Sequence, residues 1–131
     1  MPSDVGVWEP KRPLHIEAKK LRHYVAVMAA ADARNLAASL SADELEADAA
    51  LMQQREESWD AASELGDDDI ETLIRFFTLA EMQLSGWDGG KQSPVIYLVK
   101  ILKDRGTFTP ELRKWIKSNT DNRYLPYGSV L

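Results

Sequence analysis

Cysteine is absent from this 131-residue chain, and histidine occurs only twice. The lack of thiols excludes disulfides, iron–sulfur clusters, thiolate metal sites and a cysteine nucleophile. The two histidines, His15 and His23, are too far apart along one helix to bind the same ion directly. Neither a paired-histidine metal motif nor a serine nucleophile elbow occurs. We therefore expect no metal, no cofactor and no catalytic residue. The sequence favours a protein that is not an enzyme.

Long apolar runs are also missing. The longest, at residues 25–31, is mostly alanine and falls far short of the ~20 residues that a membrane span needs. Residues 1–13 lack the apolar core of a signal peptide. Hydrophobic residues nevertheless make up 44% of the chain, which is enough for a globular core. We expect a soluble, cytoplasmic protein that folds as one domain.

The sequence does contain clear signals for where helices begin and end. Between these signals, apolar residues recur at spacings of three and four, as on one face of a helix. Ser41 and Glu44 have the spacing of a capping box. Ser93 and Thr109 each precede a proline, an arrangement typical of a helix start. These signals predict an all-α, five-helix bundle domain over residues 14–131, with helices at about 14–39, 42–65, 68–85, 94–105 and 110–119.

Further expectations concern the ends of helices and of the chain. We expect Gly66 to end the second helix in the left-handed conformation, and an aspartate among residues 67–69 to cap the next. Prolines in residues 1–13 predict an extended N-terminal arm. Residues 123–131 lack helical periodicity but are too apolar for a solvated segment. They predict an ordered, non-helical C-terminal tail that packs on the bundle or on a partner.

Charge is unevenly distributed along the chain, whose net charge is −5. Residues 35–86 contain two basic and thirteen acidic side chains, whereas residues 87–131 contain eight basic and four acidic ones. One interpretation is an acidic helix face that is simply solvated. The other is that the acidic segment meets a basic surface, which belongs to the C-terminal third of this chain, to a second copy or to another protein.

The loop at residues 86–93 is a candidate anion site. It combines glycines, a lysine and a hydroxyl just before a helix N-terminus, where free backbone N–H groups can hold a phosphate. It is not a P-loop, because the required glycine spacing is absent and no strand precedes it. The alternative is a flexible connector with Trp87 packed into the core. The proposed anion-binding residues are Gly89, Gly90, Lys91 and Ser93.

The C-terminal part of the chain is a candidate partner-binding surface. The basic helix at 110–119, paired with the helix before it, has the outline of a helix-turn-helix that would contact phosphates. The alternative is an ordinary helical hairpin with an exposed basic face. Aromatic residues in the arm and tail offer apolar contacts. The candidate partner-binding residues are Trp8, Arg113, Lys114, Lys117, Arg123, Tyr124 and Tyr127.

These observations favour a protein–protein interaction or adaptor module that binds another protein or a second copy of itself. One alternative is a nucleic-acid-associated regulator that uses the helix at 110–119. Another is an enzyme or binder of a phosphorylated small molecule at residues 86–93. A basic helix neutralised by the acidic segment would favour the protein partner, whereas a continuous, unneutralised basic face would favour nucleic acid.

Overall fold

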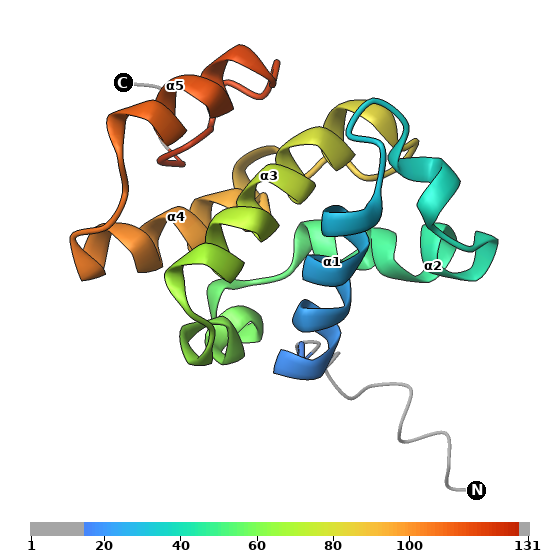
Figure 1. Ribbon diagram of the computed structural model, residues 1–131, viewed down its shortest axis with the longest axis horizontal. Helices are drawn as coiled ribbons and strands as arrows, with labels where there is room; N and C mark the ends of the chain where they lie inside the picture. Colours follow the sequence, from blue (N-terminus) through green and yellow to red (C-terminus); the bar gives the residue numbers. More distant parts are fainter. Residues whose placement is uncertain (1–14, 129–131) are drawn as a thin grey trace, which may run out of the picture.

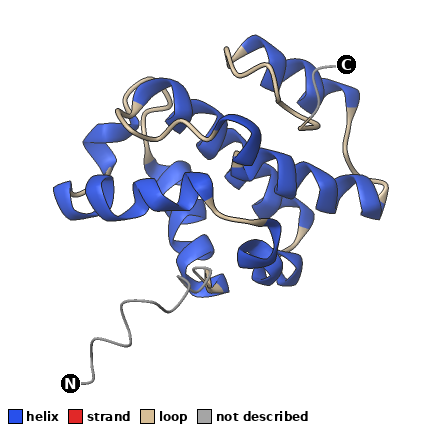
Figure 2. Ribbon diagram, turned by 180° about the vertical axis from the view of Figure 1, so that it is seen from behind, coloured by secondary structure: helices blue, strands red, loops and turns tan. Residues whose placement is uncertain are grey.

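The computed structural model describes residues 15–128, so the expected arm at 1–13, with Trp8, lies outside the described residues. Within the described part the chain forms five α-helices and four short 3-10 helices, without a strand (Figure 2). The all-α class is therefore confirmed. The α-helices are α1 (Ala18–Ala30), α2 (Ala42–Ala47), α3 (Asp67–Gln83), α4 (Pro94–Arg105) and α5 (Pro110–Ser118). The 3-10 helices are η2 (Leu36–Ser39), η3 (Asp48–Gln53), η4 (Glu56–Glu64) and η5 (Gly90–Gln92).

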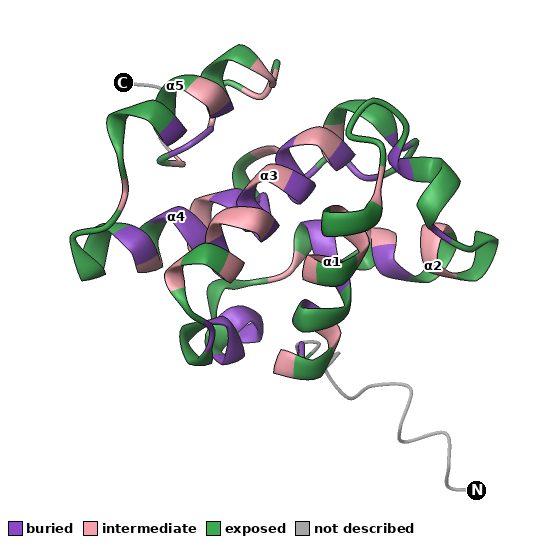
Figure 3. Cartoon of the chain, viewed as in Figure 1, coloured by how far each residue is buried: buried purple, intermediate pink, exposed green. Residues whose placement is uncertain are grey.

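Helix α3 is the centre of the fold. It runs between α1 and α4 in Figure 1 and makes its most extensive contacts with these two helices. Figure 3 shows buried residues along α3 and α4, in contrast to the exposed outer side of α5. The buried positions of α3 cover more than one of its faces, as the apolar pattern predicts. They are Ile70, Leu73, Ile74, Phe76, Phe77, Thr78 and Ala80.

Aromatic rings from distant parts of the sequence pack around α3. The ring of Phe76 lies 4.8 Å from that of Tyr24 on α1 and 6.3 Å from that of Trp87, measured between centroids. Trp59 of η4 meets Phe77 edge to face at 5.4 Å. Trp87 is fully buried and its indole N–H donates to the carbonyl of Leu45 at 2.9 Å. Large buried rings contribute strongly to a core, so they fix α1, η4 and residues 86–93 against α3.

A polar network joins α1 to the segment that contains α2 and η3. The buried hydroxyl of Tyr24 donates to Asp48, whose carboxylate also accepts from Lys20 at 2.7 Å. His23 lies 2.5 Å from the Glu44 carboxylate. The backbone N–H of Ser41 is the main cause of a lowered pKa at Glu44, and His23 adds to it. Each of these contacts therefore joins a side chain of α1 to a side chain of α2 or η3.

The single helix expected at 14–39 is wrong, because the α-helix ends at Ala30. Asp32 bonds locally instead: its side chain accepts from the backbone N–H of Arg34 at 2.9 Å, and its carbonyl accepts from that of Asn35. Short polar side chains compete with helical hydrogen bonding in this way. The chain returns to helical turns only in η2.

The single helix expected at 42–65 is also wrong. It is divided into α2, η3 and η4, with Gln54 extended between the last two. In an α-helix, Glu56, Asp60 and Glu64 would repel one another at a four-residue spacing. A 3-10 helix has three residues per turn, which matches the spacing of the buried side chains in this segment. The buried pairs three residues apart are Asp48 and Leu51, Ser58 and Ala61, and Trp59 and Ala62.

The remaining helix ends are close to those expected. The capping box of Ser41 is present, and the Thr109 side chain accepts from the third residue of α5. Gly106 ends α4 in the left-handed conformation, with φ 74°. Gly66 differs from the expectation: with φ −73° it precedes α3 as its N-cap, so no aspartate of residues 67–69 caps the helix. All three aspartates lie in the first turn, where they complement the helix dipole.

Residues 119–128, which we call the tail, follow α5 without a further helix and fold back on the bundle. The non-helical tail expected at 123–131 is confirmed over residues 123–128, and residues 129–131 lie outside the described residues. Leu125 and Pro126 are buried, and the tail passes beneath α5 in Figure 1. Gly128 approaches Ile96 of α4 so closely that an added Cβ would lie 3.2 Å from its Cγ2. The described part of the tail therefore packs within its own chain. No helix within residues 15–128 has both the length and the apolar character that crossing a membrane requires.

Candidate functional site

Glu81, near the end of α3, connects three parts of the chain. Its carboxylate accepts from the Ser93 hydroxyl at 2.5 Å, from the Gly89 backbone N–H at 3.1 Å and from the Asn122 side-chain amide at 3.1 Å. The same amide donates to the Gly90 carbonyl at 2.9 Å. Helix α3, the loop at 86–93 and the tail therefore meet at one carboxylate.

This geometry changes the interpretation of the predicted anion site. Gly89 and Ser93 do present donors to an anion, but that anion is the side chain of Glu81. Lys91 is exposed and makes no ion pair within the described residues. A phosphate at this position would have to displace Glu81 and would lie close to Asp88. The structure therefore lends no support to phosphate binding by the loop.

Two further features show how tightly this loop is built. An added Cβ on Gly89 would lie 2.7 Å from the Met52 carbonyl oxygen and from the Ser93 Cα, so only glycine fits there. Burial raises the pKa of the Glu81 carboxyl above its usual range, and the hydrogen bonds from Ser93, Gly89 and Asn122 oppose that shift. The loop is a packed connection, with Trp87 in the core, rather than a flexible one.

A cavity of about 380 Å³ lies beside Glu81, between the end of α3 and the tail. It contains three of the predicted site residues, Gly90, Arg123 and Tyr124. Sequence reasoning missed Glu81 and Asn122, which join the two segments. Nothing in the sequence distinguishes Glu81, because α3 contains five other charged residues. Asn122 gives no signal either, since asparagine is common after a helix end. The cavity also contacts Met82, Asp88, Thr120 and Asp121.

The outer face of α5 is basic. Arg113, Lys114 and Lys117 are all exposed, on the side away from the buried Leu112 and Ile116. At 3.6 residues per turn, the three cations fall within an arc of about 100°. None of them makes an ion pair with any other described residue.

Two cations of α4, unlike those of α5, pair with acids of the same chain. Lys100 pairs with Glu56 of η4 at 3.0 Å. Arg105 pairs with Asp67 at 2.8 Å and also donates to the carbonyls of Leu65 and Ser63. The acidic segment therefore meets part of the protein's own C-terminal third. The cations of α5 do not take part, because none of them pairs with an acid among the described residues.

Helices α4 and α5 do not form a helix-turn-helix. Only residues 106–109 connect α4 to α5, but the two helices diverge in Figure 1 and make few contacts with each other. Buried Leu125 and Pro126 of the tail belong to the segment that runs back beneath α5. In a DNA-binding helix-turn-helix, the two helices pack against each other around a short turn. Because α4 and α5 do not pack in this way, the structure does not support a helix-turn-helix.

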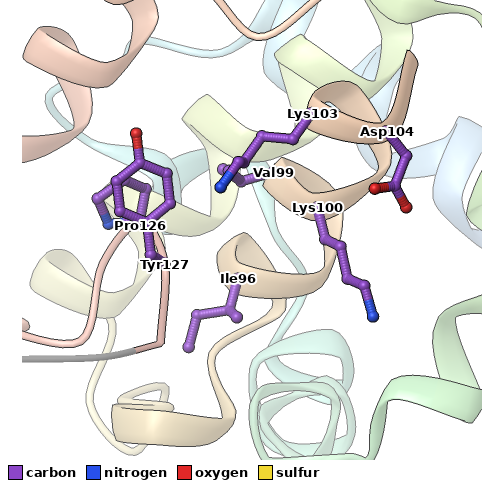
Figure 4. A pocket seen from close by; sticks show the side chains of 7 residues that line it. All are labelled: Ile96, Val99, Lys100, Lys103, Asp104, Pro126 and Tyr127. Atoms are coloured by element: carbon purple, nitrogen blue, oxygen red, sulfur yellow. The ribbon is translucent and has the colours of Figure 1, made fainter. Parts of the chain in front are cut away.

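A second cavity, of about 330 Å³, forms a groove between α4 and the tail (Figure 4). We call it the α4–tail groove. The ammonium of Lys103 lies 4.4 Å from the centre of the Tyr127 ring, on one side of the groove. Tyr127 also meets Phe108 edge to face at 6.1 Å, yet 44% of it is exposed. The groove is formed by Ile96, Val99, Lys100, Lys103, Asp104, Pro126 and Tyr127.

These features define a small all-α domain with a basic helix and an apolar groove, both next to its C-terminal tail. Compared with known proteins, the chain matches no family, no curated protein and no solved structure. No group of three or more metal-ligating side chains occurs among residues 15–128. The candidate binding surfaces are therefore the outer face of α5 and the groove beside the tail.

Proposed function

We propose that this chain is a protein-binding module and that α5 receives an acidic surface of another protein. The observation that carries the proposal is the outer face of α5, where Arg113, Lys114 and Lys117 are exposed without an ion pair in the described residues. The cations of α4, in contrast, neutralise acids of the same chain. A surface of one charge raises association rates and selects partners of the opposite charge.

Nucleic acid is the second candidate, because a basic face that the acidic segment leaves unneutralised is the feature expected of a nucleic-acid binder. The size of the face favours a protein. Helix α5 has nine residues and three outward cations, whereas typical DNA-binding proteins contact about 6–10 phosphates. The net charge of −5 also opposes an approach to a polyanion.

The test first identifies the partner through a photo-crosslinking residue placed at Lys114 in the native cell. Purified partner is then titrated onto the wild type and onto the variant R113E/K114E/K117E. The matched control, K19E/R22E/R34E, reverses the same number of exposed cations on α1 and in the turn after it. We expect the α5 variant to bind roughly tenfold or more weakly, and the wild-type affinity to fall with salt. The control variant retains its affinity.

Equal affinity of the wild type and the α5 variant for the purified partner would overturn the proposal. A random 20-base-pair duplex titrated under the same conditions tests the second candidate. Tighter binding of the duplex than of the partner, lost in the α5 variant alone, would replace the protein by nucleic acid.

A further inference from the structure

We infer that the α4–tail groove anchors an aliphatic side chain from an acidic, amphipathic segment of the partner protein. This inference rests on the proposed function, because it assigns the same acidic partner a second contact. The groove has an apolar floor, an aromatic wall and a basic rim. It therefore selects an apolar side chain as well as acidic charge, whereas α5 selects acidic charge alone.

The floor is the side of α4 that faces the tail, and the described chain covers it only in part. Ile96, Val99 and Lys103 recur at spacings of three and four, so they share one side of the helix. Val99 is 1% exposed and belongs to the core cluster, whereas Ile96 is only half-buried, so Ile96 supplies most of the accessible floor. The cavity of about 330 Å³ has room for an aliphatic side chain.

The wall is built by the tail and is held in place from both sides. The Tyr127 ring contacts both Lys103, at 4.4 Å, and Phe108, at 6.1 Å. The neighbouring Pro126 is buried, and Gly128 lies directly against Ile96. A tyrosine that is already fixed loses little freedom on binding, and exposed tyrosines are enriched among residues that dominate interfaces.

The rim selects the charge of the occupant. In Figure 4, Lys103 leans towards the Tyr127 ring, while the side chain of Lys100 points away from that ring. Asp104 is the one acid among the groove residues. Lys103 makes no ion pair with a described residue, and the pair between Lys100 and Glu56 is solvent-exposed. A segment that carries carboxylates on either side of its apolar residue therefore fits, whereas a basic one would be repelled.

The test uses a labelled 15-residue peptide of glutamate and leucine with the leucines at helical spacing. One control peptide replaces each leucine with serine, and another replaces each glutamate with lysine. Fluorescence anisotropy with the full chain follows binding at low salt. We expect the glutamate–leucine peptide to bind, the serine peptide to bind roughly tenfold more weakly, and the lysine peptide not to bind. Equal binding of the leucine and serine peptides would show that charge alone attracts them, which would overturn the inference.

Variants then locate the peptide. Tyr127→Ala and Lys103→Glu are each expected to weaken binding at least roughly fivefold, with thermal melts confirming that both variants fold. Lys91→Glu, the same charge change in the loop at 86–93, is the matched control and retains binding. The reversed pair, K100E/K103E with the lysine–leucine peptide, is expected to restore binding. Failure of this rescue, or unchanged affinity in both groove variants, would overturn the inference.

The same variants separate this inference from the proposed function. If the groove variants bind the purified partner as tightly as the wild type while R113E/K114E/K117E does not, only the groove assignment is wrong. If the peptide binds in the groove but the α5 variant keeps full affinity for the partner, only the role of α5 is wrong. Self-association in sedimentation that is lost with Lys103→Glu, without peptide binding, would make a second copy of the chain the occupant and overturn the inference.

Discussion

At the end of α3, the side chain of Glu81 accepts hydrogen bonds from three separate donors. Glu81→Ala would leave the Ser93 hydroxyl, the Gly89 N–H and the Asn122 amide without this acceptor. We expect it to lower the free energy of unfolding by roughly 3 kcal/mol, because unpaired buried donors cost about 1–3 kcal/mol each. Glu81→Gln keeps an acceptor for two donors and can donate to Ser93, so it should cost less than about 1 kcal/mol. Urea unfolding of both variants checks the difference; equal losses would contradict it.

The same residue predicts a pH dependence of stability. Burial raises the pKa of Glu81, so the folded state holds its proton more strongly than the unfolded state does. The stability from this group is therefore complete below the usual glutamate pKa and is lost as the pH rises through the raised value. Thermal melts of the wild type and Glu81→Gln should show it: the wild type loses melting temperature relative to the variant as the pH rises from about 4 towards neutral. A constant difference would contradict the prediction.

Residues of the site could be predicted where their contacts lie close in sequence, and not where the contacts join distant segments. Glycines, a lysine and a serine before a helix predict an anion at the loop, and Gly89 and Ser93 do face a carboxylate. The sequence does not show that the carboxylate comes from Glu81, eight or more residues earlier and on another helix. Nor does it place Asn122 beside them, because that contact depends on how the tail folds back.

Among the elements, α5 is the helix whose stability is easiest to change locally. It has nine residues, two of which are buried, and begins at the Thr109 cap. Thr109→Ala should cost about 1 kcal/mol by removing the acceptor for the Leu112 N–H. Hydrogen exchange should show faster exchange in α5 and unchanged protection in α3. Ser118→Ala, at the exposed end of the same helix, is the control. Uniformly faster exchange across the protein would mean that α5 does not open independently.

The elements that could be predicted are those whose boundaries depend on neighbouring residues. The caps at Ser41, Ser93 and Thr109 act within one turn, and each lies where expected. The division of residues 42–65 could not be predicted in the same way. Several of its buried residues form pairs three positions apart, and this spacing becomes informative only once α1 and α4 are known to pack against the segment.

At the scale of the whole molecule, the sequence shows that acidic and basic residues are segregated but not which of them meet. The fold divides the basic residues into two groups. Lys100 and Arg105 of α4 reach acids around η4 and the start of α3, whereas the outward cations of α5 reach none among the described residues. This division follows from the direction in which the chain leaves α4. No local sequence pattern predicts that direction.

The division predicts which cations stabilise the fold. Arg105 donates to the carbonyls of Leu65 and Ser63 as well as to Asp67, so Arg105→Glu should lower the free energy of unfolding by roughly 2–3 kcal/mol. R113E/K114E/K117E changes three exposed side chains without described partners and should change it by less than about 0.5 kcal/mol per residue. Urea unfolding at two salt concentrations provides the measurement. A large loss of unfolding free energy in the α5 variant would show that these cations stabilise the fold. An unchanged free energy would show that the fold does not need them, as expected of a surface that binds a partner.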